Sequence, residues 1–252
     1  MSTITKVGDK AIVDIVFGDD TQVLRLYKGD DLIWEKDNGG LPIGYEEIKY
    51  MTSDHVQYID TGIILDPSYC RLEFKYNRRN VSSNDKLFGS FDSSTIKYSM
   101  MFYINPGSIE TAHVAYGSIW PELTYYIRGS EANIDREVIF ELSPNGLVPT
   151  VDGTTTSTMQ FSQMQNIYTM YLFGVNTDGQ FDTNSNANVR IYYFKIYNTS
   201  TYDLVRDFVP CLDNNGVPCM YDRVSGQSFY NLGAGQFGYE KMDGTIVPIV
   251  NS

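Results

Sequence analysis

Short runs of strand-forming residues, each ending at a turn signal, recur along almost the whole chain. Residues 71–76 alternate polar and apolar side chains, which places Leu72, Phe74 and Tyr76 on one face of an extended segment. Residues 168–173 form a continuous apolar run, which is typical of a central strand buried on both faces, and residues 189–197 form the longest apolar strand. Helical periodicity is weak everywhere. This pattern predicts an all-β antiparallel sandwich or barrel.

The turns and the composition support the same fold class. Residues 143–146 separate two predicted strands with the turn sequence Ser-Pro-Asn-Gly, and Asp152 followed by Gly153 is a strong hairpin signal. The chain contains 20 Tyr and 13 Phe, and aromatic side chains pack well on a pleated, half-buried surface. With 252 residues, it is long enough for one large sandwich and a small additional module.

The chain divides into four predicted parts. Residues 1–36 read as three short strands, residues 37–42 as a linker with Gly and Pro, and residues 43–240 as the sandwich. Residues 241–252 form a tail, in which Pro248 restricts any strand over 246–250 to a sheet edge.

The first 36 residues cannot bury much apolar area by themselves, because three short strands enclose almost no interior. We therefore predict that they pack on another protein or another copy, as an attachment module. Its candidate interaction residues are Leu24, Leu26, Tyr27, Leu32, Ile33 and Trp34.

The net charge and the apolar segments exclude two kinds of partner. The formal net charge is −12, which repels a polyanion such as DNA on average. No stretch approaches the about 18 apolar residues that a membrane-spanning helix needs, and the first residues lack the apolar run of a signal peptide. We predict no nucleic-acid binding, no membrane insertion and synthesis in a cytoplasm.

Three cysteines, Cys70, Cys211 and Cys219, are too few for a disulfide framework. Cys211 and Cys219 flank a short loop that would bring them together in a hairpin. Buried free thiols are the favoured state, and no spacing of cysteine and histidine suits zinc.

Neither histidine occurs in a recognisable catalytic motif. No Gly-x-Ser-x-Gly sequence is present, and His55 and His113 are predicted to be surface residues. We therefore predict no catalytic residues.

The most attractive candidate site for a sugar is Trp120 with Tyr125 and Tyr126, because exposed aromatic rings bind sugar faces. Packing of the same rings in the core is the alternative.

Three groups of motifs, in conserved order along about four fifths of the chain, resemble concanavalin A-like, laminin-G-type sandwiches of phage and prophage proteins. They are residues 41–63, residues 151–197 with Val-Asp-Gly and the long apolar strand, and residues 204–231. In the last group, Arg206 or Arg223 is expected to form a structural ion pair with Asp207 or Asp222. The first 36 residues resemble the short β-modules that begin phage tail, fibre and capsid-associated proteins.

The resemblance implies a non-enzymatic virion protein: a head fibre, a capsid decoration or a tail-associated component. It implies a location on the virion surface after assembly in the bacterial host cytoplasm, other virion proteins as partners, homo-oligomerisation and binding of bacterial surface polysaccharide.

Two further properties occur in this fold family. Glycoside hydrolases of the family use paired carboxylates, so a polysaccharide-degrading enzyme is the alternative function. Its candidates are Glu46 with Glu47, on opposite faces, and Glu137 with Glu141, whose spacing fits one face. An ordinary solvent-facing stripe is the favoured interpretation of Glu137 and Glu141.

Calcium is the second property that the family implies. Asp178, Asp182 and Asn184 lie in a loop rich in oxygen ligands, although their spacing fits no calcium motif and such residues also dominate ordinary loops. We expect no cofactor to be required.

Overall fold

The structure, a computed structural model, consists of two compact units, Met1–Leu41 and Pro42–Ser252. The structure describes both backbone and side chains for Phe102 and for residues 40–42, 44–65, 69–79, 85–94, 133–158, 167–183 and 187–250. In the other strands it describes only the backbone pairing. Among the residues that the structure describes, no helix is long and apolar enough to cross a membrane.

The first unit contains short antiparallel strands. β1 pairs with β2, and the next three strands form a sheet in the order β3-β4-β5. Leu26 in β4 stands opposite Trp34 in β5. The side chains predicted for attachment all belong to β4 and β5, and they lie outside the described residues. The strands are β1 (Lys6–Val7), β2 (Lys10–Ala11), β3 (Asp14–Phe17), β4 (Val23–Lys28) and β5 (Asp31–Glu35).

The larger sheet of the second unit has 11 strands among the described residues, in the order β15-β14-β13-β8-β19-β20-β6-β23-β24 with β21 and β22 attached to β20. Its pairs are antiparallel throughout. The strands are β6 (Glu46–Thr52), β8 (Cys70–Arg78), β13 (Asp135–Ser143), β14 (Gly146–Val151), β15 (Thr154–Thr155), β19 (Val189–Asn198), β20 (Asp203–Leu212), β21 (Pro218–Asp222), β22 (Gln227–Tyr230), β23 (Gly238–Lys241) and β24 (Ile246–Val247).

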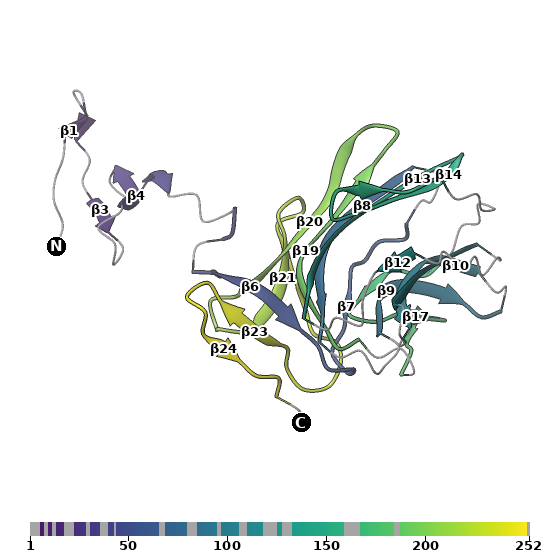
Figure 1. The fold of residues 1–252 in the computed structure, drawn as a ribbon. Helices are drawn as coiled ribbons and strands as arrows, with labels where there is room; N and C mark the ends of the chain where they lie inside the picture. Colours follow the sequence, from purple (N-terminus) through teal and green to yellow (C-terminus); the bar gives the residue numbers. More distant parts are fainter. Residues whose placement is uncertain are drawn as a thin grey trace. The chain divides into compact units, whose positions relative to one another are not determined.

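The smaller sheet has eight strands among the described residues, in the order β12-β11-β10-β9-β16-β7 with β17 and β18 beside β9. In Figure 1, the larger sheet bends around this smaller sheet. The strands are β7 (Ile59–Asp60), β9 (Asp85–Asp92), β10 (Lys97–Asn105), β11 (Glu110–Gly117), β12 (Tyr125–Ile127), β16 (Tyr171–Leu172), β17 (Asn176–Thr177) and β18 (Gln180–Phe181).

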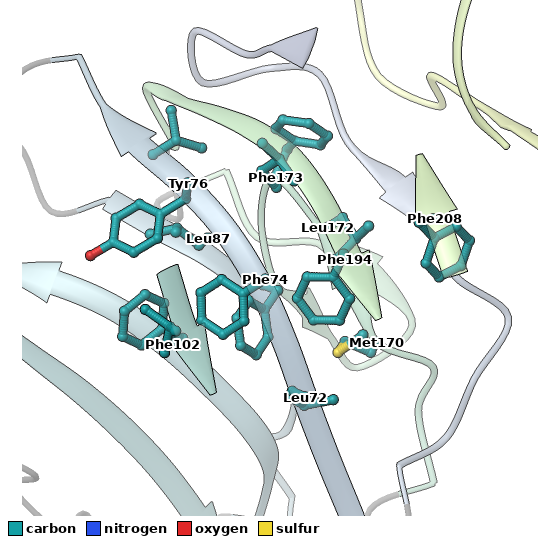
Figure 2. Packing of buried hydrophobic residues seen from close by; sticks show 14 of the residues in the cluster. Leu72, Phe74, Tyr76, Leu87, Phe102, Met170, Leu172, Phe173, Phe194 and Phe208 are labelled. Atoms are coloured by element: carbon teal, nitrogen blue, oxygen red, sulfur yellow. The ribbon is translucent and has the colours of Figure 1, made fainter. Parts of the chain in front are cut away.

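An aromatic core fills the space between the two sheets, as Figure 2 shows. Phe74 of β8 is its centre, with ring centroids 5.1 Å from Phe88 of the smaller sheet and 5.4 Å from Phe194 of β19. Leu72 and Tyr76, which share the face of Phe74, are also buried. The alternation in residues 71–76 therefore correctly predicted the inner face of β8.

The all-β antiparallel sandwich predicted from the sequence is confirmed. The predicted hairpin at Asp152 and Gly153 is also present, and both residues have the positive φ that a tight two-residue turn requires. The tail forms the edge strand β24, which ends before Pro248.

One strand prediction was too long. Residues 168–173 were expected to form a full central strand, but only Tyr171–Leu172 pair as β16, between β7 and β9. Phe173 has a φ of +63°, which ends the extended run. Residues 170–173 are buried as expected, whereas residues 168 and 169 are half-buried, so the prediction holds for burial of most of the run and fails for strand length.

Two ion pairs, where the sequence predicted one without fixing its partners, hold the β20–β21 hairpin together. Arg206 lies 3.3 Å from Asp222, and Arg223 lies 3.5 Å from Asp207. The fully buried Asp222 also accepts hydrogen bonds from the backbone N–H groups of Asp207, Val224 and Ser225. Asp222 is a structural residue, which agrees with the architectural interpretation of this motif.

Candidate functional site

Three hollows lie along the outer face of the larger sheet, the face directed away from the aromatic core. The face is formed by alternate residues of neighbouring strands, because successive side chains of a strand point to opposite sides. Register places Glu73 of β8 between Ile139 of β13 and Lys195 of β19. We define the outer face by Arg71, Glu73, Lys75, Glu137, Ile139, Glu141, Arg190, Tyr193, Lys195 and Tyr197.

The largest hollow, the Tyr202 hollow, has a volume of about 290 Å³. Its lining includes Tyr202, a residue that is 87% exposed in the turn between β19 and β20. Asn198 holds this turn by accepting hydrogen bonds from the backbone N–H groups of Ser200 and Thr201. Tyr202 itself has a φ of +60°, a conformation that costs a non-glycine residue about 1 kcal/mol or more. The turn therefore displays an aromatic ring to solvent in a strained backbone conformation.

Charged and hydroxyl groups line the Tyr202 hollow. Arg71 forms an ion pair with Glu73, and Tyr197 donates a hydrogen bond to the other oxygen of Glu73 over 3.1 Å. Burial, followed by the negative charge of Glu73, raises the pKa of Tyr197 to about 12. The Tyr197 hydroxyl thus remains protonated at neutral pH, where it serves as a donor.

The second hollow, the Tyr193 hollow, has a volume of about 200 Å³ and shares Glu73 with the first. Glu137 and Thr150 add polar groups to its lining, and Tyr193 adds a ring. Burial, followed by the charges of Glu137 and Glu73, raises the pKa of Tyr193. The two hollows are therefore neighbours with the same combination of tyrosine and carboxylate.

A hydrogen-bonded group separates these hollows from the third. Tyr192 donates to Asp135 over 2.7 Å, and the Lys75 ammonium lies 3.2 Å from the same carboxylate. Burial opposes ionisation of Asp135, but the hydrogen bonds from Tyr192, Asn77 and Lys75 outweigh it and lower its pKa. The group holds the Tyr192 ring on this part of the sheet.

The third hollow, the arginine hollow, has a volume of about 220 Å³ and lies at the opposite end of β19. Arg190 and Arg79 line it, together with Tyr50 and residues 246–249 of the tail.

The predicted sugar site at Trp120, Tyr125 and Tyr126 is not tested by these hollows. Trp120 lies outside the described residues, and Tyr125 and Tyr126 belong to β12, whose side chains are not described. The aromatic residues of the outer face were not predicted as a site. The alternation of residues 71–76 indicated that Arg71, Glu73 and Lys75 share one face, but not which tyrosines lie beside them.

The two carboxylate pairs considered for hydrolysis lie in different places. Glu137 and Glu141 share the outer face, as their spacing predicted, and line different hollows. Glu46 and Glu47 are exposed at the start of β6, where Glu46 accepts hydrogen bonds from Lys241. Glu73 lines the Tyr202 hollow with Glu141 and the Tyr193 hollow with Glu137, but the sequence analysis did not predict it as a site residue.

The loop considered for calcium uses its carboxylates in internal bonds. Asp178 accepts a hydrogen bond from the Ser93 backbone N–H over 2.9 Å, and Asp182 lies 3.0 Å from the Lys86 ammonium. Asn184 lies outside the described residues. In the described ranges, no group of three acidic, histidine or cysteine residues is arranged for a metal ion. Calcium binding stays a prediction that these contacts do not favour.

His55 corrects part of the histidine prediction. It was expected at the surface, but it is half-buried with a φ of +92°, and its Nδ1 atom is buried. The loop from β6 to β7 folds inward there, because the His55 backbone N–H donates to the Ala187 carbonyl over 3.3 Å. His113 belongs to β11, and its side chain is not described.

The cysteine prediction agrees with the structure. Cys211 and Cys219 stand opposite each other in the β20–β21 pair, with sulfur atoms 3.5 Å apart, and both are buried free thiols, as is Cys70. The hydrogen bond to Cys219, together with burial, raises the pKa of the Cys211 thiol.

Comparisons with known proteins are limited to the fold. No family model and no curated protein matches the chain. A solved structure of mouse laminin alpha1 chain, domains LG4-5, is 10% identical with a TM-score of 0.43, and covers 63% of this chain and 43% of its own. A mutant of Trypanosoma rangeli sialidase displaying trans-sialidase activity is 12% identical with a TM-score of 0.39, covering 55% of this chain and 23% of its own. The chain thus spans less than half the length of either protein.

Proposed function

We propose that the chain is a non-enzymatic binding protein of a bacteriophage particle, whose sandwich presents its outer face to polysaccharide on the bacterial surface. In this proposal, residues 1–36 attach the protein to other virion proteins, and several copies assemble on the virion surface.

The exposed ring of Tyr202 above the Tyr202 hollow carries the polysaccharide part of the proposal. A sugar presents an apolar C–H face that packs on an aromatic ring, and hydroxyl groups that need donors and acceptors nearby. The Tyr202 hollow offers the Tyr202 ring, the Arg71 guanidinium and the Glu141 carboxylate within one lining. A mixture of aromatic and polar groups of this kind suits an uncharged sugar residue of a longer chain.

Two other parts of the proposal, the attachment role of residues 1–36 and the bacteriophage origin, have separate support. The strands β3, β4 and β5 are short and rich in apolar residues, and three short strands bury little apolar area by themselves, which favours packing on a partner. The bacteriophage assignment comes from the resemblance of the sequence motifs to phage proteins.

Immunogold labelling of intact phage particles tests the bacteriophage assignment, and absence of label from every particle component would refute it. A stable folded monomer of residues 1–40 would refute the attachment role.

Replacement of Tyr202 by asparagine tests the polysaccharide site. Asparagine tolerates the left-handed conformation and removes the ring, so the fold should be kept. We expect affinity for a bound host polysaccharide to fall at least about tenfold, or about 1.4 kcal/mol, in isothermal titration calorimetry. The matched control is Leu232→Asn, which removes another exposed apolar side chain outside the outer face. Equal affinity of Tyr202→Asn and the parent chain would exclude this site.

A polysaccharide-degrading enzyme is the second candidate, favoured by the three carboxylates Glu73, Glu137 and Glu141 on one face. Retaining and inverting glycosidases need a pair of facing carboxyl groups beside the bound sugar. An enzyme would release reducing ends from host polysaccharide, and Glu141→Gln would abolish that release. Binding without any release of reducing ends would leave the non-enzymatic function.

A further inference from the structure

The arginine hollow contains two guanidinium groups that form no ion pair with a carboxylate among the described residues. Arg79 follows β8, and its Nη1 atom approaches the Thr52 hydroxyl at 3.5 Å. Arg190 of β19 stands opposite Thr52 of β6, which brings the two arginines into one lining. Among the described residues, neither arginine forms an ion pair.

The Arg190 side chain packs on an aromatic ring of the neighbouring strand. Its guanidinium lies 4.8 Å from the centroid of the Tyr50 ring, a distance suited to a cation–π interaction. Its Nε atom is buried and has no hydrogen-bond partner among the described residues. A buried donor without a partner is uncommon in folded proteins, and it leaves the hydrogen-bonding capacity of this guanidinium incompletely used.

The carboxylates nearest to the arginines offset this charge only in part. Glu240 forms an ion pair with Lys49 over 2.9 Å, and that hydrogen bond is the main cause that lowers the pKa of Glu240, while the charge of Arg190 contributes less. Asp54 lines the arginine hollow as well, so two positive groups face one negative group there. The whole chain carries a net charge of −12, so an anion can be favoured only by a local group of this kind.

We propose that the arginine hollow binds the carboxylate of an acidic sugar residue, such as a hexuronic acid. Guanidinium groups recognise a planar carboxylate through paired N–H donors, which a lysine cannot reproduce. The other wall of the hollow consists of Val247, Pro248 and Ile249, an apolar surface against which a sugar ring can pack.

Arg190 lies on the same strand, β19, as Tyr197 of the Tyr202 hollow, which connects the arginine hollow with the proposed polysaccharide site. The identity of the polymer rests on the proposed function. Arg190 and Tyr197 lie seven residues apart on one strand, roughly 23 Å at about 3.3 Å per residue. One extended polysaccharide could therefore occupy the Tyr202 hollow and the arginine hollow together. The polymer that the protein recognises would then be an acidic one, with uncharged contacts at one end and a carboxylate at the other.

NMR titration of the full chain tests the inference with monomeric galacturonate and its neutral methyl ester as probes. We expect the Nε–Hε signals of Arg79 and Arg190 to shift with galacturonate and to stay unchanged with the ester. Absence of a shift with galacturonate would overturn the inference, even if a polysaccharide binds at Tyr202. Binding of inorganic phosphate in preference to galacturonate would overturn the assignment to a carboxylate. A shift at both arginines in a chain that binds no polysaccharide would support the inference while refuting the proposed function.

Variants assign these signals and measure the contribution of each arginine. Arg79→Gln changes an exposed side chain and should weaken galacturonate binding at least tenfold without affecting folding. Arg190→Lys keeps the charge but loses the paired donors, and a similar loss is expected. Arg136→Gln, which removes a guanidinium paired with Asp152 away from the hollow, should bind like the parent chain. Unchanged binding by Arg79→Gln and Arg190→Lys would overturn the inference.

Discussion

At the scale of single residues, the sandwich contains an ion pair that water does not reach. Arg78 at the end of β8 lies 2.5 Å from Asp85 at the start of β9, and their side chains are 3% and 0% exposed. The other oxygen of Asp85 accepts a hydrogen bond from the Asn188 backbone N–H over 2.9 Å. The pair joins the larger sheet to the smaller one, so its charges have a structural role at the rim of the core.

Replacement of Asp85 by asparagine should destabilise the sandwich strongly. The variant keeps the size of the side chain but leaves the buried Arg78 charge without its counter-charge, which costs about 3–5 kcal/mol. Urea unfolding monitored by circular dichroism measures the loss. Glu47→Gln removes an exposed carboxylate and serves as control, with an expected change below about 0.5 kcal/mol. A loss of the same size in both variants would contradict the structural role of the pair.

Tyr171 should make stability depend on alkaline pH. Burial, followed by the charge of Asp60 and by Tyr58, raises its pKa to about 12, whereas an unfolded tyrosine titrates at about 10. The neutral form is therefore favoured in the folded chain. Its stabilisation is fully present below pH about 10 and is lost as the pH rises towards about 12.

The variant Tyr171→Phe keeps the ring but cannot ionise. Between pH 9 and 11, its unfolding free energy should fall less steeply than that of the parent chain, with a total difference of at most about 2–3 kcal/mol. Urea titrations at a series of pH values measure the two slopes. Identical slopes would show that Tyr171 ionises as freely in the folded as in the unfolded chain.

At the scale of elements, loops that pass close to neighbouring backbone determine how the strands of the second unit meet. The loop after β22 is organised by Asn231, whose side-chain oxygen accepts hydrogen bonds from the Tyr58 and Gly233 backbone N–H groups. Its amide nitrogen donates to the Gly235 carbonyl over 2.9 Å. One asparagine thus connects this loop to the segment before β7.

Gly233→Ala should disrupt that connection. A Cβ atom at Gly233 would lie 1.8 Å from the Val56 carbonyl oxygen, a backbone atom that cannot move alone. We expect a loss of about 1–3 kcal/mol or more in urea unfolding, because the loop must shift. The neighbouring exposed residue supplies the control, Ala234→Ser, which should unfold like the parent chain. Equal stability of both variants would mean that the loop is not closely packed there.

At the scale of the whole molecule, the second unit combines a closed aromatic core with an outer face of tyrosines and charges. Strand β8 contributes to both, because its alternate side chains point into the core and onto the outer face. Phe74 packs between the sheets, while Glu73 lies on the outer face and bonds to Tyr197 of the next strand. The binding proposed for this face would therefore require no opening of the core.

The strand pattern alone determined the fold class, the inner face of β8 and the hairpin at Asp152. These depend on the period of side chains along a strand and on local turn geometry, which neighbouring residues determine. A structural ion pair of Arg206 or Arg223 with Asp207 or Asp222 was also anticipated, because these residues lie close together in the sequence around one hairpin. The structure decided which arginine pairs with which aspartate.

Only the tertiary structure decided which strands are neighbours, and with them the candidate site. Arg79 and Arg190 are more than a hundred residues apart in the sequence, yet the pairing of β19 with β8 and β6 places them in one hollow. Local periodicity carries no information about such pairing, because register between distant strands results from how the whole core packs. Tyr202 was missed for a related reason: an exposed and a buried tyrosine look alike until the turn that displays the ring is known.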